Sequence, residues 1–478
     1  MIEFEFADLH CHPTLKTYGR TFDKGSSSKG KSDIWHQKKP TFHALFLQRL
    51  TGITRFSQAD FSSMLSSRVR FAFVSLYPFE KGFFFTPWLP DHISARLAAW
   101  VTSIGFHRVT YLQRHKNYFE DLMGELRFLE ESPRNCYLNG TKYSWSFLKP
   151  GQKTYSIEKR PNHLYVIPTI EGAHILNTGL REYGRKASHG EVLDNIRQLK
   201  KLENAPFFIT LAHNFNNDLC GHAPSLNGLG GILDQSENMG TGFTELGWEV
   251  IRHLMDPEWG RPIYIDLKHM SLKARKEFYA WHRDTQCAAP FLVSHGAFTG
   301  LSLNESGERS PLFAEDEINF YDEELVLLAR SGGVFGLQLD AKRLAPKADI
   351  RKSVFSGKAK DQVYKSAGIF WNQIRHAAEV LDAHNLPAWD TLCIGSDFDG
   401  TIDPLERIWS VREFNILANA LMTYAKTYLQ AGKLKQEKNR NLSAEQVIRK
   451  LTLENAERFV TQCWKGVPLM VPDGNGGS

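Results

Sequence analysis

The chain has 478 residues, of which 42% are hydrophobic and 23% are charged. These fractions are typical of soluble globular proteins, and they exclude an intrinsically disordered chain or a fibrous repeat. The 58 basic and 53 acidic residues nearly balance, with a net charge of +5, so we expect no nucleic-acid partner.

Cues for export and for membrane insertion are missing from the sequence. The opening stretch "MIEFEF" is not a basic leader followed by an apolar segment, and no run of about 18 apolar residues occurs. We therefore expect a cytoplasmic protein without a membrane partner. The six cysteines are scattered without a CxxC pair, which argues against a disulfide framework and against a zinc knuckle.

Eight short apolar runs recur along the chain, and most of them end in His, Asp or Glu. In order they are "IEFEFADLHCH", "VRFAFVSLYP", "LYVIPTIEGAH", "PFFITLAHN", "PIYIDLKH", "PFLVSH", "GGVFGLQLD" and "LCIGSDFDG". The later runs alternate with segments such as "EVLDNIRQLKKL", whose apolar residues recur at helical spacing. This alternation predicts an α/β fold, the (β/α)8 TIM barrel, in which functional residues lie at the carboxyl ends of the strands.

Two connections are much longer than a barrel needs. The first connection spans about residues 14–67, after the first predicted strand, and the second spans about residues 79–160, after the second predicted strand. We interpret both as insertions that form lids or partner surfaces. Extra helices are expected after the last strand. We predict a single domain over residues 1–470 and a disordered tail over residues 471–478.

The stretch "FADLHCHP" at residues 6–13 places two histidines at the end of the first predicted strand. Successive side chains on a strand point to opposite faces, so His10 and His12 share a face and Cys11 opposes them. Two imidazoles on one face can bind one metal ion. We therefore predict that His10 and His12 are metal ligands and that Cys11 is a packing residue.

The other predicted strands also end in polar residues, which would gather at the same end of the barrel. They are Glu171, His213, His269, His295, Asp340, and the pair Asp397 and Asp399. Imidazole and carboxylate ligands suit zinc and other divalent transition metals. Glu171 is the obvious bridge between two ions, and a hydroxide held between them would be a nucleophile at neutral pH. Asp397 is the expected proton carrier, with Asp399 as the alternative, while Asp340 is either a pocket residue or a loop cap.

Five longer stretches are more specific than the strand ends alone. They are "TIEGAH", "LAHNFNN", "GFTELGWEVIRHLMDPEWGRPIYIDLKHMS", "LVSHGAF" and "IGSDFDG". Each is similar to the corresponding stretch of the renal or membrane dipeptidase family, within the amidohydrolase superfamily, and together they cover most of residues 160–405. The resemblance implies a metal-dependent hydrolase, with two zinc ions, that cleaves an amide, peptide or related ester bond of a small substrate.

The same resemblance implies a role for each residue that matches a family motif. The glutamate matching Glu171 bridges the two zinc ions, and the histidines matching His269 and His295 complete the second metal site. The histidine matching His213 contacts the scissile group of the substrate, and the aspartate matching Asp397 handles the proton.

Two positions depart from the family pattern. The dipeptidases resemble this chain at the first strand but have His-x-Asp there, whereas this chain has His12, a ligand with one less negative charge. The family also has an arginine that holds the substrate carboxylate, and Ile318 stands at that point, with Arg309 nearby but out of register. The sequence therefore predicts an uncharged end of the pocket and poor hydrolysis of ordinary dipeptides.

Two alternatives to a dipeptidase-like hydrolase stay open. Metal-dependent phosphoesterases and deoxyribonucleases have a similar barrel and ligand order, although "LAHNFNN" and "GSDFDG" favour the hydrolase. A non-catalytic metal-binding barrel could instead act as a scaffold through its insertions. The expected partner is a small molecule such as a dipeptide or an N-acyl amino acid, and a homo-oligomer is compatible with the sequence.

Overall fold

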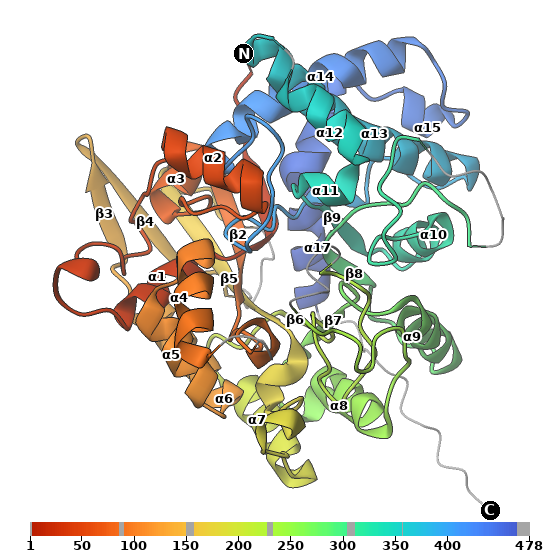
Figure 1. Ribbon diagram of the computed structural model, residues 1–478. Coiled ribbons are helices and arrows are strands. Elements are labelled where there is room, and N and C mark those ends of the chain that lie inside the picture. Colours follow the sequence, from red (N-terminus) through yellow and green to blue (C-terminus); the bar gives the residue numbers. More distant parts are fainter. Residues whose placement is uncertain are drawn as a thin grey trace, which may run out of the picture.

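A ring of eight parallel strands forms the centre of the molecule (Figure 1). The computed structural model describes residues 2–85, 90–149, 157–226, 233–303, 311–355 and 357–465. The strands of the ring follow one another in chain order: β1 (Phe6–Cys11), β2 (Val69–Leu76), β5 (His163–Glu171), β6 (Phe208–Thr210), β7 (Tyr264–Asp266), β8 (Leu292–Gly296), β9 (Val334–Leu337) and β10 (Leu392–Ile394). The predicted TIM barrel is thus confirmed.

The ring closes between its first and last strands. The backbone N–H of His12 donates to the carbonyl of Phe398 (2.8 Å), and that of Asp397 donates to the carbonyl of His10 (2.9 Å). These bonds join the carboxyl end of β1 to the segment after β10. The chain ends that carry the predicted site residues are therefore fixed by the barrel itself.

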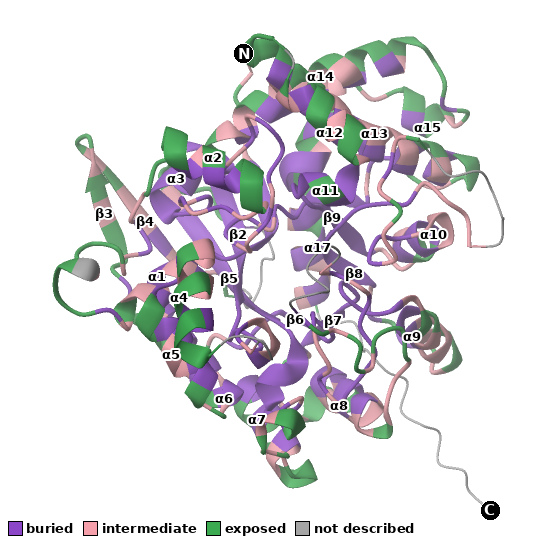
Figure 2. Ribbon diagram, in the orientation of Figure 1, coloured by how far each residue is buried: buried purple, intermediate pink, exposed green. Residues whose placement is uncertain are grey.

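The strands are apolar because both of their faces are buried. Every residue of β1, β2, β6, β7, β8, β9 and β10 is buried, and the ring is purple in Figure 2. Parallel strands covered by helices read as nearly continuous hydrophobic runs. This is why short apolar runs were sufficient to predict all eight strands.

Helices cover the outside of the ring, where Figure 2 shows exposed residues in green. From the third strand of the ring onward they are α7 (His189–Lys201), α8 (Glu245–Met255), α9 (Leu272–Asp284), α10 (Asp322–Arg330), α11 (Ala341–Leu344), α12 (Lys347–Val354) and α13 (Ala359–Ala383). After β10 come α14 (Phe414–Gln430), α15 (Glu437–Arg440), α16 (Ala444–Arg449) and α17 (Asn455–Trp464), with a π-helical turn, η7 (Lys450–Glu454), before the last. Short 3-10 turns complete this part: η3 (Ala173–Leu176), η4 (Arg181–Tyr183), η5 (Pro257–Trp259) and η6 (Val411–Glu413).

The two insertions lie on one side of the ring, in red to light orange in Figure 1. The connection after β1 holds α1 (Pro13–Thr21), η1 (Gly25–Ser27), α2 (Phe42–Thr51) and α3 (Phe61–Ser66). The connection after β2 holds η2 (Lys81–Phe83), α4 (Asp91–Thr102), α5 (Phe106–Arg114), α6 (Tyr118–Glu131) and the strands β3 (Asn135–Leu138) and β4 (Thr141–Phe147). The antiparallel pair β3–β4 extends the sheet, because β4 runs parallel to the first half of β5.

The expected helices after the last strand are present, and Ser443 and Gln446 form a capping box at the start of α16. The hairpin β3–β4 and the 25-residue helix α13 were not predicted. That residues 1–470 form one domain stays a prediction, and the predicted tail, 471–478, lies outside the described residues. No described helix is long and apolar enough to span a membrane.

Candidate metal centre

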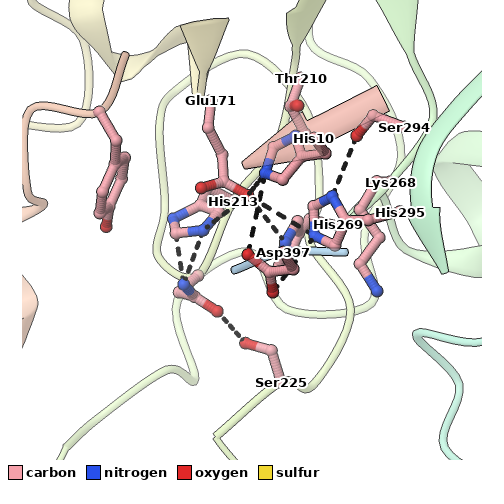
Figure 3. Close-up of polar contacts among 12 residues, drawn as sticks. His10, Glu171, Thr210, His213, Ser225, Lys268, His269, Ser294, His295 and Asp397 are labelled. Carbon is pink, nitrogen blue, oxygen red and sulfur yellow. Dashed lines mark hydrogen bonds and ion pairs between the residues drawn. The ribbon is translucent and has the colours of Figure 1, made fainter. Parts of the chain in front are cut away.

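Seven polar side chains converge inside the carboxyl end of the ring, and all of them except His12 are labelled in Figure 3. Each comes from the end of a strand or from the turn that follows it: His10 and His12 from β1, Glu171 from β5, His213 from β6, His269 from β7, His295 from β8 and Asp397 from β10. Six of the seven are buried, with relative exposures of 7% or less. The residues that the sequence singled out for metal binding and catalysis therefore lie together.

Glu171 lies at the centre of the cluster, and five imidazoles direct their Nε2 atoms at its carboxylate. The distances are 3.4 Å for His10, 3.2 Å for His12, 3.6 Å for His213, 3.5 Å for His269 and 3.6 Å for His295. Imidazole nitrogens and a carboxylate held this close together can bind a divalent cation. The donor set therefore fits a metal centre of the zinc or transition-metal class.

The ligand atoms form three overlapping groups of three, each with its atoms within 4.8 Å of one another. The groups are His10, His12 and Asp397; His10, Glu171 and His295; and Glu171, His213 and His269. Glu171 belongs to two of them, as a bridging carboxylate would. His213, which the sequence assigned to substrate contact, is within reach of a metal ion as well.

Burial and charge shift the pKa values of the cluster in opposite directions. Burial alone would raise the pKa of Glu171, but the charges of His213, His10 and His12 hold it well below its ordinary value. Burial lowers the pKa of His269 and of His295 well below the usual range, so both rings are neutral near pH 7. Neutral imidazole and ionised carboxylate are the forms that bind metal ions.

Glu80 holds His213 from outside the cluster. Its Oε2 accepts a hydrogen bond from Nδ1 of His213 (2.5 Å), and Oε1 accepts one from the backbone N–H of Phe215 (3.0 Å). Burial opposes its ionisation, but His213 lowers the pKa of Glu80 to about 2. Glu80 follows β2 in the second insertion. Sequence reasoning missed this residue, although the stretch "SLYPFEKG" places an acidic side chain shortly after the end of the strand.

Two further aspartates hold the chain next to site residues, and both were missed from the sequence. Asp266 accepts hydrogen bonds from the backbone N–H (2.9 Å) and the hydroxyl (2.6 Å) of Ser294. Asp8 accepts the same pair from Ser396, at 2.8 and 2.5 Å. Each serine directly precedes a residue of the cluster, so these bonds orient one histidine and one aspartate.

The remaining predicted carboxylates lie outside the cluster. Asp399 accepts hydrogen bonds from Lys16 Nζ (2.8 Å) and from the backbone N–H of Ala59 (2.9 Å), in the first insertion. Asp340 is buried at the start of α11 and accepts a hydrogen bond from the backbone N–H of Asp403 (3.3 Å), as a loop cap does. Ile318 is buried as well, with 1% exposure, and Arg309 lies outside the described residues.

A cavity of about 800 Å³ adjoins the cluster through Glu80. The second insertion and the segments after β5 and β6 line it, with Tyr118, His174, Tyr183 and Phe215 among its walls. Pockets of this size hold small molecules.

No protein-family model matches the chain, and no curated protein sequence matches it significantly. Several solved structures are similar to it. One is the dipeptidase AC, a metallopeptidase of family M19, with 15% identity over 97% of this chain and 100% of that chain and a TM-score of 0.49. Another is the probable dipeptidase PvdM from Pseudomonas aeruginosa, with 16% identity over 97% of this chain and 96% of that chain and a TM-score of 0.49. A third is a metallopeptidase from Rhodobacter sphaeroides with a phosphinate mimic of L-Ala-D-Ala, with 15% identity over 97% of this chain and 100% of that chain and a TM-score of 0.48.

Two of these structures are named as dipeptidases and the third as a metallopeptidase. Their identities lie near 15% and their TM-scores below 0.5, so the fold assignment rests on the strand order and closure of this chain's own sheet.

Proposed function

We propose that this protein is a dipeptidase-like, metal-dependent hydrolase that cleaves an amide, peptide or related ester bond of a small substrate at a binuclear zinc centre. The observation that supports this function is the convergence of five buried imidazoles on one carboxylate, with a second carboxylate beside them. A cluster with so many ligand atoms has more donors than one ion needs.

Each residue of the cluster has a role in this proposal. His10 and His12 would hold one ion, His269 and His295 would hold the other, and Glu171 would be shared by both. Divalent ions bound there would supply Lewis-acid chemistry, which polarises a carbonyl group and activates water near neutral pH.

Two further residues act on the substrate and the proton. His213 presents Nε2 to the scissile group, because Glu80 accepts the hydrogen bond of its Nδ1 and so fixes the ring. Asp397 takes up a proton and returns it to the leaving group. Its carboxylate oxygens lie 3.6 Å from His12 Nε2 and 4.0 Å from His295 Nε2.

Metal analysis and a substrate panel test this proposal. Purified protein should contain close to two zinc or other divalent ions per chain and should turn over at least one member of a panel of dipeptides, N-acyl amino acids and lactones. Glu171→Gln should lose metal and activity together, since a neutral amide cannot neutralise two dications. Asp340→Asn, a buried carboxylate outside the cluster, is the matched control and should keep its metal.

The outcome that contradicts the proposal is a wild-type protein without metal, or a Glu171→Gln variant with normal metal content and turnover. Hydrolysis of phosphodiesters in the absence of any amide or ester hydrolysis would instead favour the phosphoesterase alternative.

A further inference from the structure

A buried lysine, Lys268, lies at the edge of the metal centre. It follows β7, directly before His269, and its residue is 1% exposed. In Figure 3 its side chain lies next to the cluster and no dashed line reaches its ammonium nitrogen. Its charge acts on the carboxylate of Asp397 and on the ring of His295.

The carboxylates around Lys268 are engaged by other donors. Asp266 accepts hydrogen bonds from Thr210 (2.7 Å) and from the hydroxyl of Ser294 (2.6 Å). Asp340 pairs with Lys342 at 3.4 Å. Among the described residues, the side chain of Lys268 has neither a hydrogen-bond acceptor nor an ion-pair partner for its Nζ atom.

A second cation, Arg343, makes the surroundings of Lys268 more positive. Arg343 is 7% exposed, and its guanidinium donates to Asp316 (2.8 Å) and to the carbonyl of Ser225. Its own charge is thus paired, but it repels Lys268. A buried lysine without a partner, next to a paired guanidinium, is suited to bind an anionic group.

We propose that Lys268 is the anion-binding residue of this site, and that it takes an anionic oxygen group of the substrate, a carboxylate or a phosphate, while the metal centre acts on a neighbouring bond. The inference rests on the proposed function and narrows its substrates to small acids. It also replaces the expectation drawn from Ile318, because the positive charge comes from the end of β7 and not from the segment after β8.

Two comparisons test this inference. The first needs no variant: the wild-type specificity constant for Ala-Ala should exceed that for its C-terminal amide by at least tenfold. The second is calorimetric titration of the metal-loaded protein with succinate and, separately, with inorganic phosphate. Lys268→Met should weaken the binding of at least one of these anions about tenfold or more, and which one shows whether the group is a carboxylate or a phosphate.

Controls separate a specific site from general charge and from misfolding. Lys342→Met removes a nearby cation whose side chain is 48% exposed and should leave anion binding unchanged. Lys268→Arg should restore binding in part, and metal content and melting temperature report whether each variant is folded. Unchanged anion binding in Lys268→Met, or equal losses in both methionine variants, overturns the inference.

The two proposals fail in different ways. In one outcome, the wild type hydrolyses no member of the panel, including Ala-Ala and its amide, but anion binding still depends on Lys268. The anion site is then supported and the proposed hydrolase function is wrong. If the acid and the amide are hydrolysed with equal specificity constants and the binding of neither succinate nor phosphate depends on Lys268, the hydrolase stands and the assignment of Lys268 is wrong.

Discussion

The backbone after β10 separates two aspartates that are only two residues apart. Asp397 (φ 58°) and Asp399 (φ 67°) both have left-handed backbone conformations. The alternation of side chains that holds for a strand does not apply to such a turn. Asp397 consequently faces the imidazoles, whereas Asp399 faces Lys16 and the first insertion.

This geometry predicts different results for the two carboxylates. Asp397→Asn should keep its metal but lose about a hundredfold or more in kcat, because the amide preserves shape and removes the proton acceptor. Asp399→Asn should keep turnover near the wild-type value. Steady-state kinetics together with metal analysis measure both. A fast Asp397→Asn enzyme alongside an inactive Asp399→Asn enzyme would reverse the assignment.

Glu80 is a positioning residue whose effect should reach the substrate through His213. Glu80→Gln keeps a hydrogen-bond acceptor but removes the charge that raises the pKa of His213. We expect kcat to fall about 10- to 100-fold, as for other groups that orient a site histidine, with unchanged metal content. The limb of the pH–rate profile that reports His213 should move to lower pH, because its protonated form loses a stabilising charge.

The matched control for Glu80 lines the same cavity without touching His213. Glu182 lies in that wall, and Glu182→Gln should leave the pH–rate profile in place. A purely structural role for Glu80 would lower the melting temperature and move neither limb of the profile.

At the scale of whole elements, a buried ion pair joins α9 to α10. Arg275 donates from Nε to Oε1 of Glu324 (2.7 Å) and from Nη2 to Oε2 (3.2 Å), and both side chains are almost fully buried. Glu324 also accepts a hydrogen bond from the backbone N–H of Tyr321 (3.0 Å) at the start of α10. The pair therefore fixes the entry of α10 next to α9.

Removing only one partner should be strongly destabilising. Arg275→Met leaves a buried, uncompensated carboxylate, and we expect a loss of roughly 3–5 kcal/mol in the free energy of unfolding, measured by denaturant titration. The double variant Arg275→Met/Glu324→Gln removes both charges and should recover a large part of that loss. A double variant no more stable than the single one would show that packing, and not the unpaired charge, causes the effect.

The elements that could be predicted from the sequence are those whose pattern is local. A strand buried on both faces leaves an apolar run, and its polar end marks the active face of a barrel, so β1 and β10 could be predicted together with the polar residues at their ends. The hairpin β3–β4 also had a local signal, because Asn139 and Gly140 (φ 51° and 78°) form the Asn-Gly turn typical of hairpins, but this signal was overlooked.

Other features have no local pattern to find. Glu80 and His213 are 133 residues apart in the sequence, and they come into contact only in the folded ring. Lys268 is next to a predicted ligand, but its lack of a partner depends on where Asp266 and Asp340 direct their oxygens. Such relations are set by tertiary packing, which spacing along the chain does not encode.

At the scale of the whole molecule, two carboxylates, Asp399 and Glu80, connect the insertions to the carboxyl end of the ring. The first insertion binds Asp399 through Lys16, and the second contributes Glu80 to His213 and a wall to the cavity. In the proposed function, the barrel would supply the metal ligands, and the insertions would supply the surroundings of the substrate. Changes in the insertions are therefore expected to alter substrate choice more than metal content.

The last prediction concerns the stability of the whole chain. A metal ion that binds only the folded state stabilises it by about 4 kcal/mol when its free concentration is a thousand times the dissociation constant. Without the ion, five imidazoles and two carboxylates remain crowded in the buried end of the ring. We therefore expect a strong chelator to lower the melting temperature of the wild-type protein by several degrees and to abolish turnover, and zinc, cobalt or manganese to reverse both changes.

Differential scanning calorimetry with parallel activity assays measures both changes. Glu171→Gln serves as the control, since a chain that has lost its bridging ligand should melt at the same temperature with or without chelator. A wild-type melting temperature that stays constant while metal analysis records complete removal of the ions would show that the cluster is stable without metal, and it would disconnect the fold from the proposed chemistry.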